Sequence, residues 1–123
     1  MKIIEAIKKI DSLKHNTYSQ NDKIGWMSDL DWIVKREVID THEGAEQVHF
    51  TGYDENTDQH TVLLIPAPYD TAYLLWMEAQ IDYYNGEYGK YNNAMEMFNE
   101  TFEGFKNYYN RNHMPKGSKI KFF

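Results

Sequence analysis

Apolar residues recur every three or four positions along four stretches of the chain, which is the pattern of amphipathic helices. The stretches predict helices over about 2–14, 20–40, 70–85 and 87–112. Between the second and third stretches, residues 41–67 are acidic and rich in turn-forming residues, so they predict a long irregular loop. The expected fold class is therefore all-α, a compact bundle of four helices interrupted by one long loop.

The last predicted helix carries the most regular signal, because its apolar positions alternate by three and four residues over three heptads. These positions are Tyr88, Tyr91, Met95, Phe98, Phe102, Phe105 and Tyr109. We expect this stripe to lie in the core against the second and third helices, with Phe98 and Phe102 at its centre. Packing is a better reading of the stripe than stacking on nucleic-acid bases, because base-stacking surfaces are normally accompanied by a basic groove.

Residues with strong capping preferences mark several helix ends. Ser19, followed three residues later by Asp22, predicts an N-cap with an acidic first turn. Asp70 is the expected N-cap of the third helix, and Asn85 with Gly86 is a good left-handed ending for it. The apolar register continues across this ending, so one long bent helix is an alternative. The local glycines and asparagines favour two helices.

The second predicted helix differs from the others because its apolar residues cover nearly the whole circumference. A helix that is apolar all round is buried on more than one side. In a domain this small we expect part of that surface, including Trp26 and Trp32, to face another subunit.

The long loop contains two short apolar runs, at 48–50 and 62–65, which are candidates to pair as a small β-hairpin. Proline and glycine then end the last helix near residue 114. We therefore divide the chain into one helical domain over 1–114 and a basic C-terminal tail over 115–123.

The composition supplies a core mainly through large rings and thioethers, with 10 Tyr, 3 Trp and 6 Met among 123 residues. Cysteine is absent, which excludes disulfides, thiolate metal sites and a cysteine nucleophile. No apolar stretch approaches the length of a membrane span, so we expect no membrane partner.

The net charge of −6 is distributed unevenly. Residues 37–89 contain eleven acidic residues and no lysine or arginine, whereas both flanking segments are net positive. Two interpretations remain open: a solvated acidic face, or a surface that repels nucleic acid or meets basic segments of a neighbour.

Searches for catalytic and metal-binding signatures give little. The sequence lacks a glycine-rich phosphate loop, a His-Glu-x-x-His motif and a Gly-x-Ser-x-Gly motif. The five histidines are isolated and are expected at the surface or in turns. Glu78 and Asp82 lie four residues apart and are interpreted as solvated helix charges rather than an acid–base pair. We predict no enzyme activity, catalytic residue, metal site or cofactor.

The C-terminal tail is a candidate docking peptide, because it is basic and apolar and follows a Pro-Lys-Gly break. We expect Phe122 and Phe123 to anchor it on a partner, while Lys116, Lys119 and Lys121 steer it toward acidic surface. The alternative is a frayed terminus.

Several runs of residues together resemble small head–tail connector proteins of long-tailed phages and prophages. The resemblance covers roughly residues 16–116. It is carried by Pro66-Ala67-Pro68-Tyr69-Asp70, by Glu78 to Glu87, by Tyr91-Asn92-Asn93, by Tyr108 to Arg111, and by the earlier runs 16–19 and 40–44.

This resemblance implies an adaptor, or head-completion, protein that is made in the bacterial cytoplasm and located in the virion neck. Such a helical subunit forms a homo-oligomeric ring that follows the portal and extends the DNA channel toward the tail. The implied partners are the portal protein, a stopper or tail protein and further copies of the chain, while DNA passes without specific binding. The alternative function is a small prophage regulatory or ligand-binding protein with a tyrosine-rich pocket between the third and fourth helices.

Overall fold

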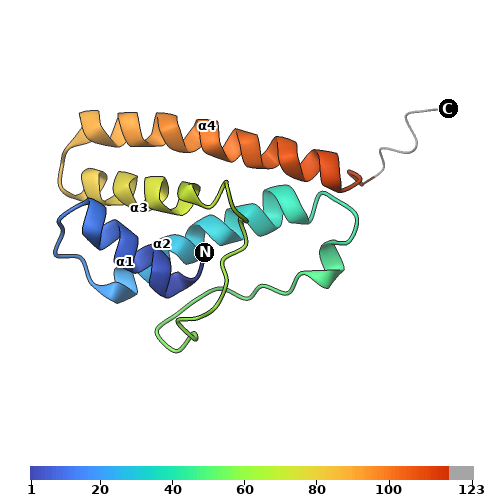
Figure 1. The fold of residues 1–123 in the computed structure, drawn as a ribbon, viewed down its shortest axis with the longest axis horizontal. Helices are drawn as coiled ribbons and strands as arrows, with labels where there is room; N and C mark the ends of the chain where they lie inside the picture. Colours follow the sequence, from blue (N-terminus) through green and yellow to red (C-terminus); the bar gives the residue numbers. More distant parts are fainter. Residues whose placement is uncertain (117–123) are drawn as a thin grey trace.

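The computed structural model describes residues 1–116 and consists of four α-helices joined by irregular segments (Figure 1). This confirms the all-α class, and each predicted helix is present within two residues of its expected start. The elements in chain order are α1 (Ile3–Leu13), α2 (Gln20–Ile33), the π-helix η1 (Val34–Ile39), the 3₁₀ turn η2 (Ala45–Gln47), α3 (Thr71–Tyr84) and α4 (Tyr88–Asn112). Residues 1–116 contain no named β-strand.

Helix α3 lies in the middle of the molecule, with α4 on one side and α1 and α2 on the other (Figure 1). Its fully buried side chains include Tyr73, Met77 and Ile81, which contribute to a single hydrophobic core. Because α3 is covered from two sides, it is apolar on more than one face, as expected of a central helix. Helix α2 lies on the same side of α3 as α1 (Figure 1).

The aromatic stripe of α4 is confirmed as core. Phe98, Phe102 and Phe105 are all buried, and the Phe98 ring lies 5.1 Å from the ring of Trp76 on α3. The predicted second helix, over about 20–40, meets α4 only through its last part: Val38 of η1 and Asn110 of α4 line one cavity, whereas α3 lies between α2 and α4 (Figure 1). At the start of the stripe, Tyr88 is exposed.

The helix ends follow the capping signals with one exception. The Asp22 amide donates to Ser19 Oγ (3.0 Å), which begins α2 as predicted. Gly86 has φ +79° and separates α3 from α4, so two helices form rather than one. Asp70 precedes α3, but its carboxylate makes no capping hydrogen bond. It lies 3.5 Å from the amino group of Met1, because a full positive charge competes well against a backbone amide.

The predicted hairpin within the long loop is wrong. Val62 forms an isolated antiparallel bridge with Lys2 instead of pairing with residues 48–50. The Ile3 amide donates to the Thr61 carbonyl (3.0 Å), and the Leu63 amide donates to the Met1 carbonyl (2.9 Å). The residues before α1 therefore satisfy backbone groups that the hairpin partner would have satisfied.

The end of the helical domain lies beyond residue 114. The Glu43 amide donates to the Met114 carbonyl (2.8 Å), and the Lys116 amide donates to the Thr41 carbonyl (3.0 Å). Between them His42 lies in a turn, one of the two expected settings, but is buried there, with its Nε2 2.6 Å from Asn110 Oδ1. Pro115 and Lys116 thus belong to the fold, and the remaining tail residues lie outside the described part of the chain.

Replacement of Phe105 by alanine should lower the free energy of unfolding by about 3–5 kcal/mol, because the side chain is fully buried and the cavity cannot refill. Chemical denaturation measures this directly. Met97→Ala on the same helix is the control, since Met97 is 56% exposed, and it should change stability by less than about 0.5 kcal/mol. A loss below about 1 kcal/mol for Phe105→Ala would contradict the packing described here.

Candidate interaction surface

Exposed tyrosines gather where α3 ends and α4 begins. Tyr83 is 49% exposed, and Tyr84 and Tyr88 are both 60% exposed. The Tyr83 ring lies 5.5 Å from Tyr84, 5.7 Å from Tyr88 and 5.4 Å from Tyr91. The Tyr84 ring continues the group to Tyr18, at 6.3 Å. We call these five residues, Tyr18, Tyr83, Tyr84, Tyr88 and Tyr91, the tyrosine patch.

The tyrosine patch rests on Trp26 of α2. The Trp26 ring stacks on Tyr84 with 6.1 Å between centroids and an interplanar angle of 12°, and Tyr18 meets it edge-on at 5.5 Å. The hydroxyl of Tyr18 donates to Asn85 Oδ1 (2.7 Å), which ties the loop before α2 to the α3–α4 turn. The patch is therefore held in place by ring contacts from three separate segments.

A shallow cleft of about 290 Å³ opens in this patch. It is lined by Tyr18, Asp22, Trp26 and Tyr84. These residues belong to α2, to the loop before it and to the end of α3. Two tyrosines line this cleft, which lies on the side of α3 that faces α2. The ligand-binding alternative instead predicted a tyrosine-rich pocket between α3 and α4.

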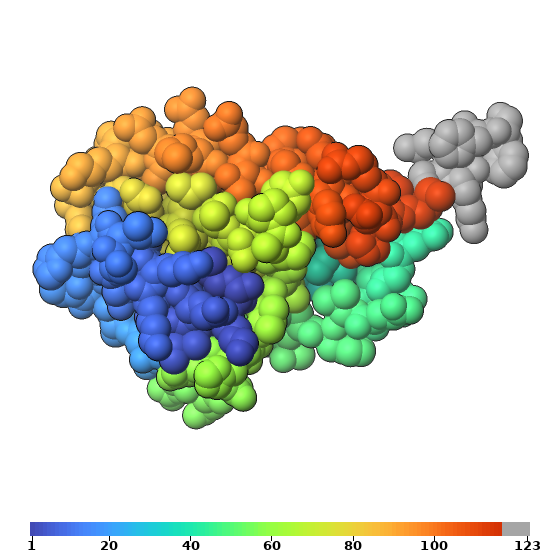
Figure 2. Space-filling view, viewed as in Figure 1, coloured from blue at the N-terminus to red at the C-terminus, as the bar shows by residue number. Residues whose placement is uncertain are grey.

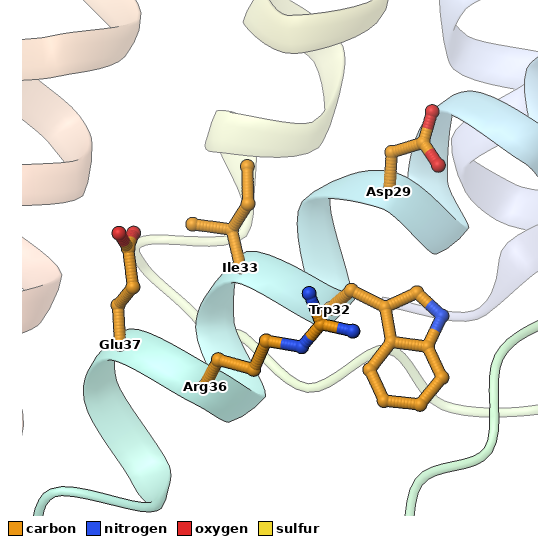
Figure 3. Close-up of a pocket in the computed structure, with 5 residues that line it drawn as sticks. All are labelled: Asp29, Trp32, Ile33, Arg36 and Glu37. Atoms are coloured by element: carbon orange, nitrogen blue, oxygen red, sulfur yellow. The ribbon is translucent and has the colours of Figure 1, made fainter.

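Trp32 occupies a different place on α2 (Figure 3). It lines a groove of about 400 Å³ together with Asp29, Ile33, Arg36 and Glu37. The Arg36 guanidinium carbon lies 5.1 Å from the centre of the indole, a cation–π contact, and the Phe50 ring meets the indole edge-on at 4.8 Å. Trp32 is half-buried by these neighbours.

The structure separates the residues predicted to bind partners. Trp26 is only 9% exposed and forms the floor of the tyrosine patch, while Trp32 lines its own groove. Lys116 is exposed at the opposite end of α4 from the patch. Lys119, Lys121, Phe122 and Phe123 lie outside the described residues. The sequence pattern predicts Tyr88 and Tyr91 in the core and assigns no role to the other patch tyrosines. The spacing of apolar residues along a helix does not show where the neighbouring helix stops covering it.

The two carboxylates of α3 differ in their surroundings. Asp82 is fully buried, contrary to the interpretation as a solvated helix charge, and Lys14 Nζ of α1 lies 2.6 Å from its Oδ1. Glu78 Oε1 lies 3.8 Å from the same lysine. Burial lowers the pKa of Lys14, but its close pairing with the Asp82 carboxylate outweighs burial and leaves the pKa above its usual value. Among residues 1–116 neither oxygen of Asp82 accepts a well-aligned hydrogen bond, so Lys14 balances the carboxylate mainly by charge.

A second buried carboxylate, Asp31 of α2, joins three parts of the chain. Its oxygens accept hydrogen bonds from the hydroxyls of Tyr53 and Tyr73, each at 2.5 Å, and from the Leu64 amide at 3.2 Å. Burial raises the pKa of Asp31 to about 6, although these three donors favour the ionised form. Burial and the charge of Asp31 in turn raise the pKa of Tyr73 well above its usual value. Every group in this cluster is satisfied internally, so its role is structural.

Within residues 1–116 no three acidic or histidine side chains come together as a metal site. None of the helices in this part of the chain combines the length and the apolar character that crossing a lipid bilayer requires. Comparison with family models, curated proteins and solved structures found no match to this chain.

The raised pKa of Asp31 predicts a specific pH dependence of stability. The folded protein keeps the proton up to about pH 6, whereas the unfolded chain releases it near its usual pKa of about 4. The folded state therefore binds more protons in this window, and its free energy of unfolding should fall by roughly 3 kcal/mol as the pH rises from 4 to above 6. Chemical denaturation at several pH values measures the fall.

Asp31→Asn should remove most of that pH dependence. The control is Asp29→Asn on the same helix, where the side chain is exposed, and it should retain the fall seen in the wild type. A wild-type stability that instead rises through this window, relative to Asp31→Asn, would contradict a protonated Asp31.

Replacement of Lys14 by methionine should destabilise the protein by about 3 kcal/mol, because it leaves the buried Asp82 carboxylate without a balancing charge. Combining it with Asp82→Asn should restore part of that loss. The control, Lys90→Met, breaks the exposed ion pair with Glu87 and should cost less than about 1 kcal/mol. Equal effects of the two lysine substitutions would show that the Lys14 pair is not buried in solution.

Proposed function

We propose that this protein is an adaptor subunit that forms a ring between the portal and the tail of a long-tailed phage. The observation that carries the proposal is the tyrosine patch, which lies within the stretch that resembles head–tail connectors. Tyr83, Tyr84 and the Asn85–Gly86 turn all belong to the run 78–87 and are exposed. These residues carry the resemblance but are not buried within the subunit. They are therefore suited to contact another protein.

The physical properties of the patch support a protein partner. Monomeric proteins rarely expose a continuous group of large apolar rings, and tyrosine is enriched at the centres of protein interfaces. The ring contacts with Trp26 and among the tyrosines restrict the side chains before binding. Binding to the patch therefore costs little additional side-chain entropy.

The acidic stretch of the chain supports contact-free passage of DNA. Six of its exposed carboxylates lie in η1 and the long loop: Glu37, Glu43, Glu46, Asp54, Glu55 and Asp58. Beyond residue 44 this segment runs along the side of the molecule away from α4 (Figure 2). A channel wall of this kind repels the DNA backbone and does not hold it.

Mixing this protein with the portal protein encoded by the same phage genome tests the proposal. Electron microscopy of the mixture should show an extra ring of density on one end of the portal. Tyr84→Ala combined with Tyr88→Ala should weaken assembly at least tenfold, because it removes two exposed rings of the patch, whereas Met97→Ala should assemble normally. Portal rings without added density at saturating protein would overturn the adaptor role.

A further inference from the structure

We propose that the tyrosine patch binds the C-terminal segment, residues 117–123, of a second copy of the chain. The inference deepens the proposed function and rests on it for its setting in a ring. It names the occupant of the patch and the direction of the contact. It assigns the exposed rings of one subunit to the basic, phenylalanine-ended tail of its neighbour.

The tail cannot reach the patch of its own subunit. The patch surrounds the start of α4, whereas the described chain ends at Lys116, beyond the other end of that helix (Figure 1). Helix α4 has 25 residues, which makes it about 37 Å long at about 1.5 Å per residue. Lys116 is also tied to Thr41 at that far end. The seven remaining residues span at most about 25 Å when fully extended, so any tail in the patch comes from another molecule.

The chemistry of the two segments is complementary. The tail ends in Phe122 and Phe123, and the patch offers stacked rings with a cleft between Tyr18 and Tyr84. Rings prefer offset or edge-on contact with other rings, which the exposed tyrosines can provide. Lys119 and Lys121 come just before the phenylalanines in the sequence. When the phenylalanine rings occupy the cleft, the two lysines are placed at the rim of the patch.

Carboxylates border the patch where the lysines would arrive. Asp22 lines the cleft itself, and Glu78 and Glu87 lie on α3 and in the turn after it. Of the nearby lysines, Lys14 is engaged by Asp82 at 2.6 Å, and Lys90 is 3.3 Å from Glu87. Glu78 Oε1 also lies 3.8 Å from Lys14, so Asp22, which forms no ion pair among residues 1–116, provides the negative charge for the lysines of the tail.

The contact is heterologous, because it joins different surfaces of two identical subunits. Such contacts generate a ring when the rotation between subunits closes, and an open filament when it does not. One tail of seven residues forms a small contact, but in a closed ring each subunit both gives and receives a tail. The ring then holds all of its contacts together by effective concentration.

Photo-crosslinking of the full-length protein tests the inference. Phe123 is replaced by benzoylphenylalanine, and this protein is mixed with ¹⁵N-labelled protein that lacks the crosslinker, so that links between molecules are recognised by mass. The expected product is a link between position 123 and residues 83–91 or 18–26 of the labelled copy. Benzoylphenylalanine at Met97, which is also exposed, is the control and should give at least fivefold less of this product.

Substitutions in the labelled copy make the test specific. Tyr84→Ala with Tyr88→Ala should reduce the yield at least fivefold, whereas Val62→Ala, at another exposed apolar position, should leave it unchanged. Raising the salt concentration should also reduce the yield, because the lysines contribute through charge. Links only within one molecule, links to other surfaces, or a yield insensitive to the tyrosines would each overturn the inference.

The same experiment with portal present separates the two proposals. The reaction of the chain with itself needs no portal, so a tail–patch link without any portal binding would overturn the adaptor role alone. Portal binding with no link to the patch would overturn the tail contact alone. If position 123 links to the portal in place of the patch, the tail is a portal anchor and the contact between subunits is refuted.

Discussion

The buried carboxylate of Asp31 is the interaction on which the arrangement of the irregular half of the molecule depends. It accepts hydrogen bonds from Tyr53 in the long loop, from the Leu64 amide near its end and from Tyr73 on α3. The Tyr73 hydroxyl in turn accepts a hydrogen bond from the Ile65 amide (2.7 Å). Leu63 and Ile65 anchor the end of the loop in the hydrophobic core, and Asp31 satisfies polar groups of the loop that would otherwise be buried without a partner.

The position of the loop determines which helix faces are left to pack against one another. The segment 61–65 crosses to the start of α1 and lies against α2 and α3, so α3 becomes the central helix. Helices α1 and α2 then pack on one side of α3 and α4 on the other. At the turn between α3 and α4, Trp26 and Tyr18 cover only part of Tyr84, and Tyr83 and Tyr88 remain exposed. The tyrosine patch is thus a consequence of how the core is centred.

The sequence predicts those parts of the fold whose causes are local. Helical periodicity, the Ser19 cap and the left-handed Gly86 each depend on a few neighbouring residues, and the structure confirms them. The errors arise where a distant residue decides the outcome. Residues 1–3 replace the expected partner of Val62, the amino group of Met1 takes the Asp70 carboxylate, and Lys14 allows Asp82 to be buried.

The same distinction explains the candidate site. Trp26 was singled out for interaction because its helix is apolar all round, and the structure places it beneath the tyrosine patch. The exposure of the patch depends on how completely distant segments cover the end of α3. No local sequence pattern specifies that. A signal was nevertheless present, because Tyr83, Tyr84, Tyr88 and Tyr91 crowd around a turn with asparagine and glycine. Turns lie at the protein surface, so a core cannot bury large aromatic rings on both sides of a turn.

The exposed acidic groups of the loop and the exposed aromatic rings occupy different parts of the molecular surface. Exposed carboxylates occupy η1 and the long loop, the tyrosines occupy the α3–α4 turn, and the described chain ends at the far end of α4 (Figure 1). A subunit with a two-fold contact needs only one self-complementary surface, whereas the proposed contact joins the tyrosine patch of one copy to the tail of another. In the proposed ring, assembly through the tyrosine patch and the tail leaves the acidic side of each subunit free, and the proposed role assigns that side to the DNA channel.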